Sequence, residues 1–215
     1  MNIRPLVKIG SDARRRLGEL GLDSETLLDV ARRGMAAAAN CTPNHPAVLP
    51  GILGWGETVC ALRDCLIPQG WRRLDEGNLP LTVNEAETVA VTVATGDEDT
   101  GRPEGNPCTK SKKGPRVAIA IAINQLQLFP FPVHLRPDDV SGRATWLLLI
   151  HRDQAARELR AELSRPVNIG QDGRVDSWSE RILLGATPFD EKFNASPASP
   201  DTPSPDIVVE IKRRA

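Results

Sequence analysis

The sequence lacks several features that often reveal where a protein works. None of its apolar stretches approaches the length of about 18 residues that a membrane-spanning helix needs, so no transmembrane helix is expected. The N-terminal residues Met1–Lys8 contain no long apolar segment, so we expect no secretory signal. The formal net charge is −1, which excludes a strong overall field that would steer the chain to nucleic acid or to a membrane.

Cysteine is scarce and tyrosine is absent. The four cysteines, Cys41, Cys60, Cys65 and Cys108, stand in unrelated sequence contexts, which is not the pattern of a disulfide framework. We therefore expect a reducing, cytoplasmic location. Arginine is far more common than lysine, and we interpret this excess, together with the missing tyrosine, as GC-rich coding of bacterial origin.

The N-terminal third of the chain is predicted to be helical. A cap at Ser11 or Asp12 predicts a helix that runs to Leu20. A second helix is expected to begin near Ser24, because apolar residues then recur at helical spacing, at Leu27, Leu28, Ala31 and Met35. A third helix is expected over Ile52–Ile67, since one face of that stretch is apolar.

A β region follows the helices. Trp71–Leu74, Leu79–Val83 and Thr88–Ala94 are predicted to form a three-stranded meander. Large β-branched residues alternate with small ones in Val89–Ala94 and again in Val117–Ile123, and this period of two favours strands over helices. We expect these two runs to be neighbours in one sheet, with the N-terminal helices covering their alanine face.

More strands are predicted towards the C-terminus. Thr145–Ile150 has the composition of a buried strand. Residues 153–164 fit either a helix or a strand, and the alternation of apolar and charged residues favours the strand. Asp172-Gly173 predicts a hairpin between Val167–Ile169 and Val175–Leu184.

Together these patterns predict a single α+β domain over residues 1–190. Its helical part, 1–68, is expected to pack on a mostly antiparallel sheet within 71–190. The serine- and proline-rich composition of 191–205 predicts a flexible tether. Residues 206–215 are expected to form an edge strand or a tail.

The polar stretch 95–116, between two predicted strands, is the most informative segment. Loops of this length are mostly functional or disordered. The stretch has three consecutive acids at 97–99 and a net charge of +4 over 101–116. Basic side chains suit a protein or a phosphate-bearing partner, and those predicted to bind it are Arg102, Lys110, Lys112, Lys113 and Arg116. The alternative is a solvated loop whose opposite charges compensate one another.

Two groups of residues have the chemistry of metal ligands. Asp97 and Asp99 follow a predicted strand, where acids can hold a metal, and this makes them catalytic candidates. Cys41 with His45, and Cys60 with Cys65, have spacings that do not fit a closed zinc site. We therefore expect these cysteines to be buried and free, and we expect no bound metal and no cofactor.

A second pair of catalytic candidates lies near the C-terminus. The segment Ile207–Lys212 resembles the metal-binding strand of PD-(D/E)xK nucleases. The resemblance implies that Glu210 and Lys212 flank a divalent metal, with Asp190 or Asp206 as the second ligand. The alternative is an edge strand with one charged face.

Cys108 is a candidate reactive thiol. It lies in the polar loop, close in sequence to Lys110, Lys112 and Lys113. Positive neighbours lower the pKa of a thiol and increase its reactivity. Because no Cys-His signature accompanies it, we expect a redox-sensitive or merely exposed thiol rather than a catalytic nucleophile.

The N-terminal helix pair resembles a helix-turn-helix. Gly21 falls at the turn, and the positions where the motif needs apolar residues hold Leu20, Leu22, Leu27 and Val30. Arg16 and Leu17 depart from the motif, and carboxylates at Glu25 and Asp29 would oppose binding to phosphates. The alternative is an αα-hairpin packed on the sheet.

These observations predict a non-catalytic, cytoplasmic binding or accessory protein. The expected partner is a protein or a phosphate-bearing molecule, engaged by loop 95–116, and no membrane contact is expected. The alternatives are a metal-dependent enzyme that acts on nucleic acid and a DNA-binding regulator that uses the N-terminal helices.

Overall fold

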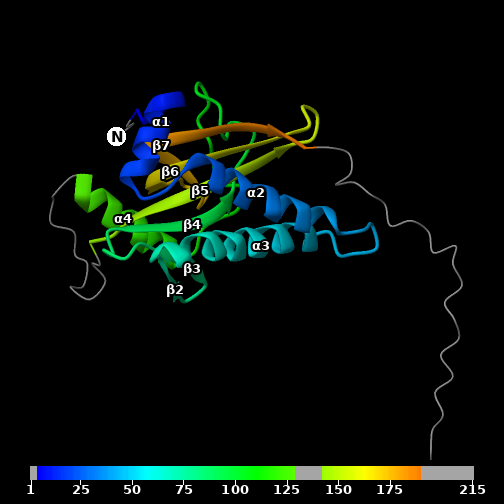
Figure 1. Ribbon diagram of the computed structural model, residues 1–215, viewed down its shortest axis with the longest axis horizontal. Coiled ribbons are helices and arrows are strands. Elements are labelled where there is room, and N and C mark those ends of the chain that lie inside the picture. Colours follow the sequence, from blue (N-terminus) through cyan, green and yellow to red (C-terminus); the bar gives the residue numbers. More distant parts are fainter. Residues whose placement is uncertain (1–3, 129–141, 190–215) are drawn as a thin grey trace, which may run out of the picture.

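The computed structural model describes residues 4–128 and 142–189. The elements in chain order are β1 (Leu6–Lys8), α1 (Gly10–Glu19), α2 (Ser24–Ala39), α3 (Leu49–Leu66), the 3₁₀ turn η1 (Ile67–Gln69), β2 (Arg72–Glu76), β3 (Leu79–Val83), β4 (Val89–Thr95), α4 (Pro115–Leu128), β5 (Ala144–Asp153), β6 (Glu158–Ile169) and β7 (Val175–Pro188). Figure 1 shows their arrangement. Within the described ranges, no helix combines the length and the apolar content needed to cross a membrane.

The strands form one sheet of seven in the order β1-β7-β6-β5-β4-β3-β2. The pairs β1–β7 and β4–β5 are parallel, and the other neighbours are antiparallel. The fold is therefore α+β, with N-terminal helices on a mostly antiparallel sheet, as the sequence predicts. The predictions for the tether at 191–205 and for the segment 206–215 lie outside the described residues.

Most of the predicted elements are confirmed. The three N-terminal helices are present, and β2, β3 and β4 form the predicted meander. The hairpin at Asp172-Gly173 joins β6 to β7. For the ambiguous segment 153–164, the prediction of a strand is confirmed from Glu158 onwards, where β6 begins.

The prediction of a strand at Val117–Ile123 is wrong, because these residues belong to helix α4. Alanine favours a helix, and Pro115 is well suited to a first helical turn. Residues 117, 120, 121 and 124 share one face at helical spacing, and the last three are buried. The chain therefore crosses from β4 through α4 to β5 before it pairs in parallel, and the neighbour of β4 is β5 rather than the segment 117–123.

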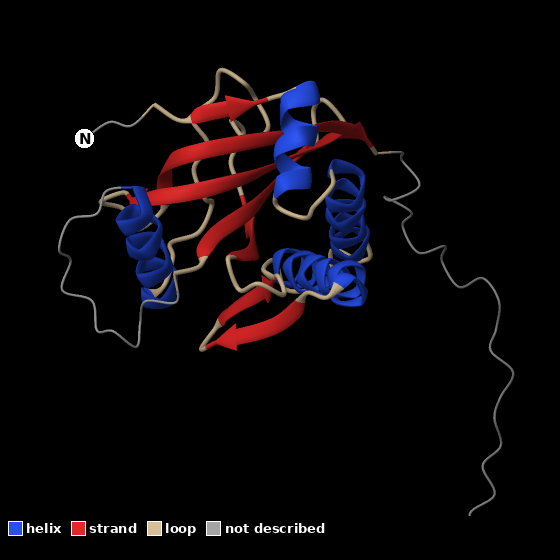
Figure 2. Cartoon of the chain, turned by 60° about the vertical axis from the view of Figure 1, so that its left-hand side comes forward, coloured by secondary structure: helices blue, strands red, loops and turns tan. Residues whose placement is uncertain are grey.

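The two faces of the sheet are covered by different helices. In β5, Trp146 and Leu148 pack in the same cluster as residues of α1, α2 and α3, whereas Leu147 and Leu149 pack with Ile121 of α4. Figure 2 shows α4 set apart from the other three helices, across the sheet. The small Ala94 of β4 packs on the α4 side, which corrects the expectation that the N-terminal helices cover the alanine face.

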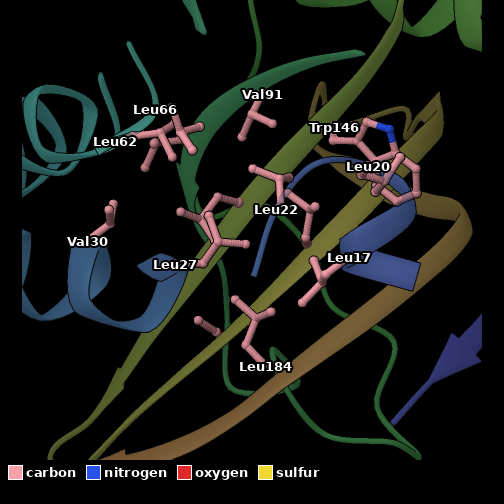
Figure 3. Packing of buried hydrophobic residues seen from close by; sticks show 14 of the residues in the cluster. Leu17, Leu20, Leu22, Leu27, Val30, Leu62, Leu66, Val91, Trp146 and Leu184 are labelled. Carbon is pink, nitrogen blue, oxygen red and sulfur yellow. The ribbon is translucent and has the colours of Figure 1, made fainter. Parts of the chain in front are cut away.

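Helices α1 and α2 pack on the sheet in the manner of the αα-hairpin alternative. Leu17, Leu20 and Leu27 point from the helices towards strand residues Val91 and Trp146 (Figure 3).

The departures of α1 from the helix-turn-helix pattern have a structural reason. Leu17 is completely buried against the strands. The Arg16 guanidinium donates to Glu180 of β7 at 2.9 and 3.1 Å, and it lies 5.8 Å from the ring centroid of Trp146. The two residues that depart from the motif, Arg16 and Leu17, therefore both contact the sheet.

Helices α2 and α3 approach each other closely at small residues. A Cβ at Gly34 would lie 1.8 Å from Oγ1 of Thr58 and 2.6 Å from the backbone oxygen of Gly54. The Thr58 hydroxyl donates to that same oxygen at 2.6 Å. Only glycine at position 34 permits this approach of the two backbones.

Candidate functional site

The candidate site is built around residues 96–114, which join β4 to α4 and fold back onto the sheet. The backbone N–H of Lys110 donates to Thr95 of β4 at 2.8 Å, and that of Thr109 donates to Val175 of β7 at 2.9 Å. The N–H of Asp97 donates to the oxygen of Cys108 at 3.1 Å, which closes the excursion. In Figure 1 the green segment after β4 lies beside β6 and β7.

A buried ion pair fixes the first part of this loop. Arg181 of β7 and Glu162 of β6 are both fully buried, and the guanidinium donates to the two carboxylate oxygens at 2.9 and 2.5 Å. The same carboxylate accepts from the N–H of Gly101 at 2.8 Å. The guanidinium also donates to the backbone oxygens of Gly105 at 2.5 Å and Arg102 at 3.1 Å. The pair thus binds the backbone of the loop at Gly101, Arg102 and Gly105.

Two further side chains hold the loop. The indole N–H of Trp178 donates to the backbone oxygen of Pro107 at 2.8 Å. Arg160 donates to the backbone oxygen of Glu98 at 2.8 Å. β6 and β7 therefore anchor the backbone of the loop through buried partners, whereas most of its charged side chains are exposed.

The predicted catalytic acids Asp97 and Asp99 support the loop itself. One carboxylate oxygen of Asp97 accepts from the N–H of Cys108 at 3.0 Å and the other from the N–H of Asp99 at 3.2 Å. The carboxylate of Asp99 accepts from the N–H of Asn106 at 3.1 Å. Among the residues the structure describes, no group of three or more His, Cys, Asp and Glu side chains is arranged to hold a metal.

The basic half of the loop faces outwards. Lys110, Lys112 and Arg116 are exposed, and Lys113 is half-buried. The N–H of Lys113 donates to the backbone oxygen of Gly173 in the β6–β7 turn at 2.8 Å, which places the segment next to that turn. In the part of the chain that the structure covers, none of these four side chains forms an ion pair. We call residues 110–116 the basic segment.

Arg102 is separated from the basic segment. Its backbone oxygen faces Arg181, and its guanidinium lies 3.9 Å from a carboxylate oxygen of Asp153. The pKa of Asp153 lies below its ordinary value, mainly because its carboxylate accepts a hydrogen bond from the N–H of Ala156. Four of the five predicted binding residues belong to the basic segment, with the side chain of Lys112 beside Gly173 and that of Arg116 beside Gly77, and Arg102 lies elsewhere.

A small cavity lies next to Lys113, where β3 diverges from β4. Only Thr82–Val91 and Val83–Ala90 pair between these two strands in the described chain, and the cavity opens beyond them. Its volume is about 230 Å³. The lining residues include Trp55, Asn78, Thr92, Lys113, Val117 and Leu147.

Among the described residues that line the cavity, Lys113 is the one that carries a charge. Burial lowers the pKa of the Lys113 ammonium below its ordinary value, with the neighbouring Cys108 acting in the opposite direction. Thr92 is 5% exposed, so its hydroxyl lies in a largely desolvated wall.

Cys108 is free and partly buried. Burial raises the pKa of its thiol, and the carboxylate of Asp97 acts in the same direction. Its sulfur donates to the backbone oxygen of Thr109 at 3.6 Å. This direction is opposite to the one that its lysine neighbours in the sequence predict.

The other predicted residues lie apart from the loop or outside the described ranges. Glu210 and Lys212, like Asp190 and Asp206, are not among the described residues. Cys60 is exposed, and Cys41 and Cys65 are partly buried, so the prediction of buried cysteines is wrong for Cys60.

The ion pair that organises the loop was missed by the sequence reasoning. Glu158, Arg160 and Glu162 alternate with apolar residues, which predicts one charged and solvated strand face. The structure buries Arg160 and Glu162 under loop 96–114. One feature of the sequence could have indicated this burial. The polar positions of this strand continue to Ser164, and Arg181 stands in the next, otherwise strongly apolar strand.

Comparison with protein-family models, with curated protein sequences and with solved structures gives no match to this chain.

Proposed function

We propose that this chain is a cytoplasmic binding or accessory protein that engages an anionic partner through the basic segment. The partner is an acidic protein surface or a phosphate-bearing molecule. One observation carries the proposal, which is the spatial separation of the charges of loop 96–114. Asp97 and Asp99 are bonded to the loop backbone, whereas Lys110, Lys112 and Arg116 are exposed without a carboxylate partner among the described residues.

The anchoring of the loop supports this proposal. A loop that must be ordered on binding loses part of its interaction energy to conformational entropy. Here the bonds to Thr95, Val175 and Gly173 already fix the backbone on both sides of the lysines. The basic side chains are therefore displayed from a fixed backbone.

The cavity beside Lys113 supports recognition of a discrete anionic group. Its lining combines Lys113 and Thr92 with the apolar residues Trp55, Val117 and Leu147. Such a combination is typical of small ligand sites, in which a few polar groups orient a ligand within an apolar recess. Its volume of about 230 Å³ suits one small group of a larger partner.

The test compares two variants with the same change in net charge. Lys110→Glu/Lys112→Glu reverses the basic segment, and Arg14→Glu/Arg73→Glu reverses two exposed arginines elsewhere. The probes are inorganic polyphosphate and polyglutamate, titrated by calorimetry at two salt concentrations. We expect the first variant to weaken binding by roughly 5- to 30-fold, since rim charges contribute about 1 kcal/mol each.

The control variant should bind within about twofold of the unchanged protein, and binding should weaken at higher salt because surface charges are screened. Preference for one probe then distinguishes a phosphate-bearing from an acidic protein partner. Equal losses in both variants, or no binding of either probe, would contradict the proposal.

A further inference from the structure

An apolar groove lies between α2 and α3, over the carboxyl ends of β4 and β5. Its volume is about 250 Å³, and its lining is mostly small or apolar. Residues that form it include Met35, Ala38, Gly51, Trp55, Ile150 and Leu159. Most of its lining comes from α2, α3 and the sheet, and it shares Trp55, Val93 and Ala94 with the cavity beside Lys113.

An exposed apolar stripe continues from this groove along α3. Val48, Ile52 and Trp55 follow the i, i+4, i+7 spacing of one helix face. They are 68%, 56% and 41% exposed. A stripe of large apolar side chains next to an apolar groove is a surface suited to binding another segment.

The described chain ends at the wall of this groove. Phe189 packs in one cluster with Met35, Leu159 and Ile150, and all three of these also line the groove. The Arg152 guanidinium, another lining group, lies 4.9 Å from the ring centroid of Phe189. In Figure 1 the end of β7 lies on the same side of the molecule as the far ends of α2 and α3.

The sequence after Phe189 contains an apolar run of suitable length. Residues 190–215 follow, and Ile207–Ile211 reads Ile-Val-Val-Glu-Ile. The 18 residues from Phe189 to Ile207 can span up to about 60 Å. The 18-residue helix α3 is about 27 Å long, so the run can reach any part of the groove.

We propose that the C-terminal run Ile207–Ile211 binds in the apolar groove between α2 and α3 of its own chain. In an extended conformation Ile207, Val209 and Ile211 share one face, which leaves Glu210 on the other. The covalent link gives the run an effective concentration in the millimolar range, which favours it over the same segment of a second copy. The run thereby covers Trp55 and the apolar wall, and it can be displaced by a competing partner.

Tryptophan fluorescence provides a selective test in the full-length chain. Of the four tryptophans, Trp71, Trp146 and Trp178 are at most 6% exposed, so collisional quenching by acrylamide reports mainly Trp55. We expect Ile207→Asp/Val209→Asp to raise the Stern–Volmer constant about twofold, because the run leaves the groove. Ala195→Asp/Ala198→Asp, with the same added charge outside the run, should leave the constant unchanged.

A second measurement changes the groove instead of the run. Gly51→Phe fills the groove, and a Cβ there meets no atom within 4 Å, so the helix tolerates it. Hydrogen exchange of the segment 205–215 should become faster in this variant. Equal quenching in the unchanged chain and in Ile207→Asp/Val209→Asp would overturn the proposal. So would protection of Trp55 that depends on protein concentration, since it would assign the groove to a second copy.

Discussion

At the scale of single residues, the buried Arg181–Glu162 pair decides where the long loop lies. Each side-chain nitrogen and oxygen of the pair has a hydrogen-bond partner. Ser164 and the N–H of Gly101 donate to the carboxylate, and two loop carbonyls accept from the guanidinium. A buried pair in such a setting is costly to break, since removal of one partner leaves a charge without compensation.

The first prediction concerns this pair. Arg181→Met leaves the Glu162 carboxylate buried without its counter-charge, and we expect a loss of about 3–5 kcal/mol in the free energy of unfolding, measured in urea. A double-mutant cycle with Glu162→Leu should give a coupling energy of roughly 2 kcal/mol. A loss below about 1 kcal/mol for the single variant would show that the pair does not anchor the loop.

The second prediction concerns the pH dependence of Cys108. Since burial raises the pKa of its thiol, the folded state holds this proton more tightly than the unfolded state does. The resulting stabilisation is fully present below the unfolded thiol pKa and is lost as the pH rises through the folded value. Alkylation of Cys108, followed by mass spectrometry, should therefore begin at higher pH in the folded protein than in urea. Earlier onset in the folded protein would contradict this assignment.

The residue scale also shows a limit of sequence reasoning. The basic side chains of the loop could be named in advance, because charge in a polar stretch between strands is visible in the sequence. The partnership of Glu162 with Arg181 could not, because it depends on strand register and on a loop that covers one face. The same loop desolvates Cys108, which reverses the effect expected from its lysine neighbours.

At the scale of elements, helix α4 is held on the sheet by one buried amide. Asn124 donates to the backbone oxygens of Thr145 at 2.8 Å and Pro166 at 2.9 Å, and its own oxygen accepts from the N–H of Thr145. It thus connects α4 to both β5 and β6. Together with the packing of Ile121 on Leu147 and Leu149, this contact holds the crossover helix against the sheet.

The third prediction follows from this contact. Asn124→Leu keeps a branched side chain, adds volume, and removes three hydrogen bonds from a fully buried site. We expect the free energy of unfolding to fall by at least about 2 kcal/mol, since each buried group that loses its partner costs roughly 1–3 kcal/mol. Gln125→Leu, at an exposed position of the same helix, serves as the control and should change stability by less than about 0.5 kcal/mol. Similar losses in both variants would argue against a specific role of Asn124.

The fourth prediction concerns the contact of α2 with α3. Gly34→Ala places a methyl group against Thr58 and Gly54, and we expect a loss of about 1–3 kcal/mol in thermal or urea unfolding. Gly18→Ala is the matched control, because no atom lies within 4 Å of its added Cβ. It should be neutral or stabilising by up to about 1 kcal/mol, as alanine favours a helix. If Gly34→Ala behaved like Gly18→Ala, the close contact would not be essential.

Elements differed in how far the sequence could predict them. The hairpin at Asp172-Gly173 and the N-terminal helices were predictable, because turn chemistry and helical spacing are local. The segment Val117–Ile123 was not, because alternating Ile and Ala satisfies both a strand face and a helix face. Only the residues that follow, through Leu128, extend the pattern to a full helical length.

At the scale of the whole molecule, the sheet separates two surfaces with different chemistry. The face with α4 and loop 96–114 contains the buried ion pair and displays the basic segment. The face with α1, α2 and α3 carries the apolar groove, with Trp55 near both the groove and the cavity beside Lys113. Two candidate binding surfaces thus lie on one chain of nearly neutral net charge.

The central claim is that the basic segment is the surface that binds an anionic partner. The most direct test is an NMR titration of the full-length protein with inorganic polyphosphate, in which backbone amide shifts locate the contact. The account predicts the largest shifts at residues 110–116 and at Gly173 and Arg174, with loss of these shifts in Lys110→Glu/Lys112→Glu. Shifts centred on another surface, or shifts that persist in that variant, would contradict it.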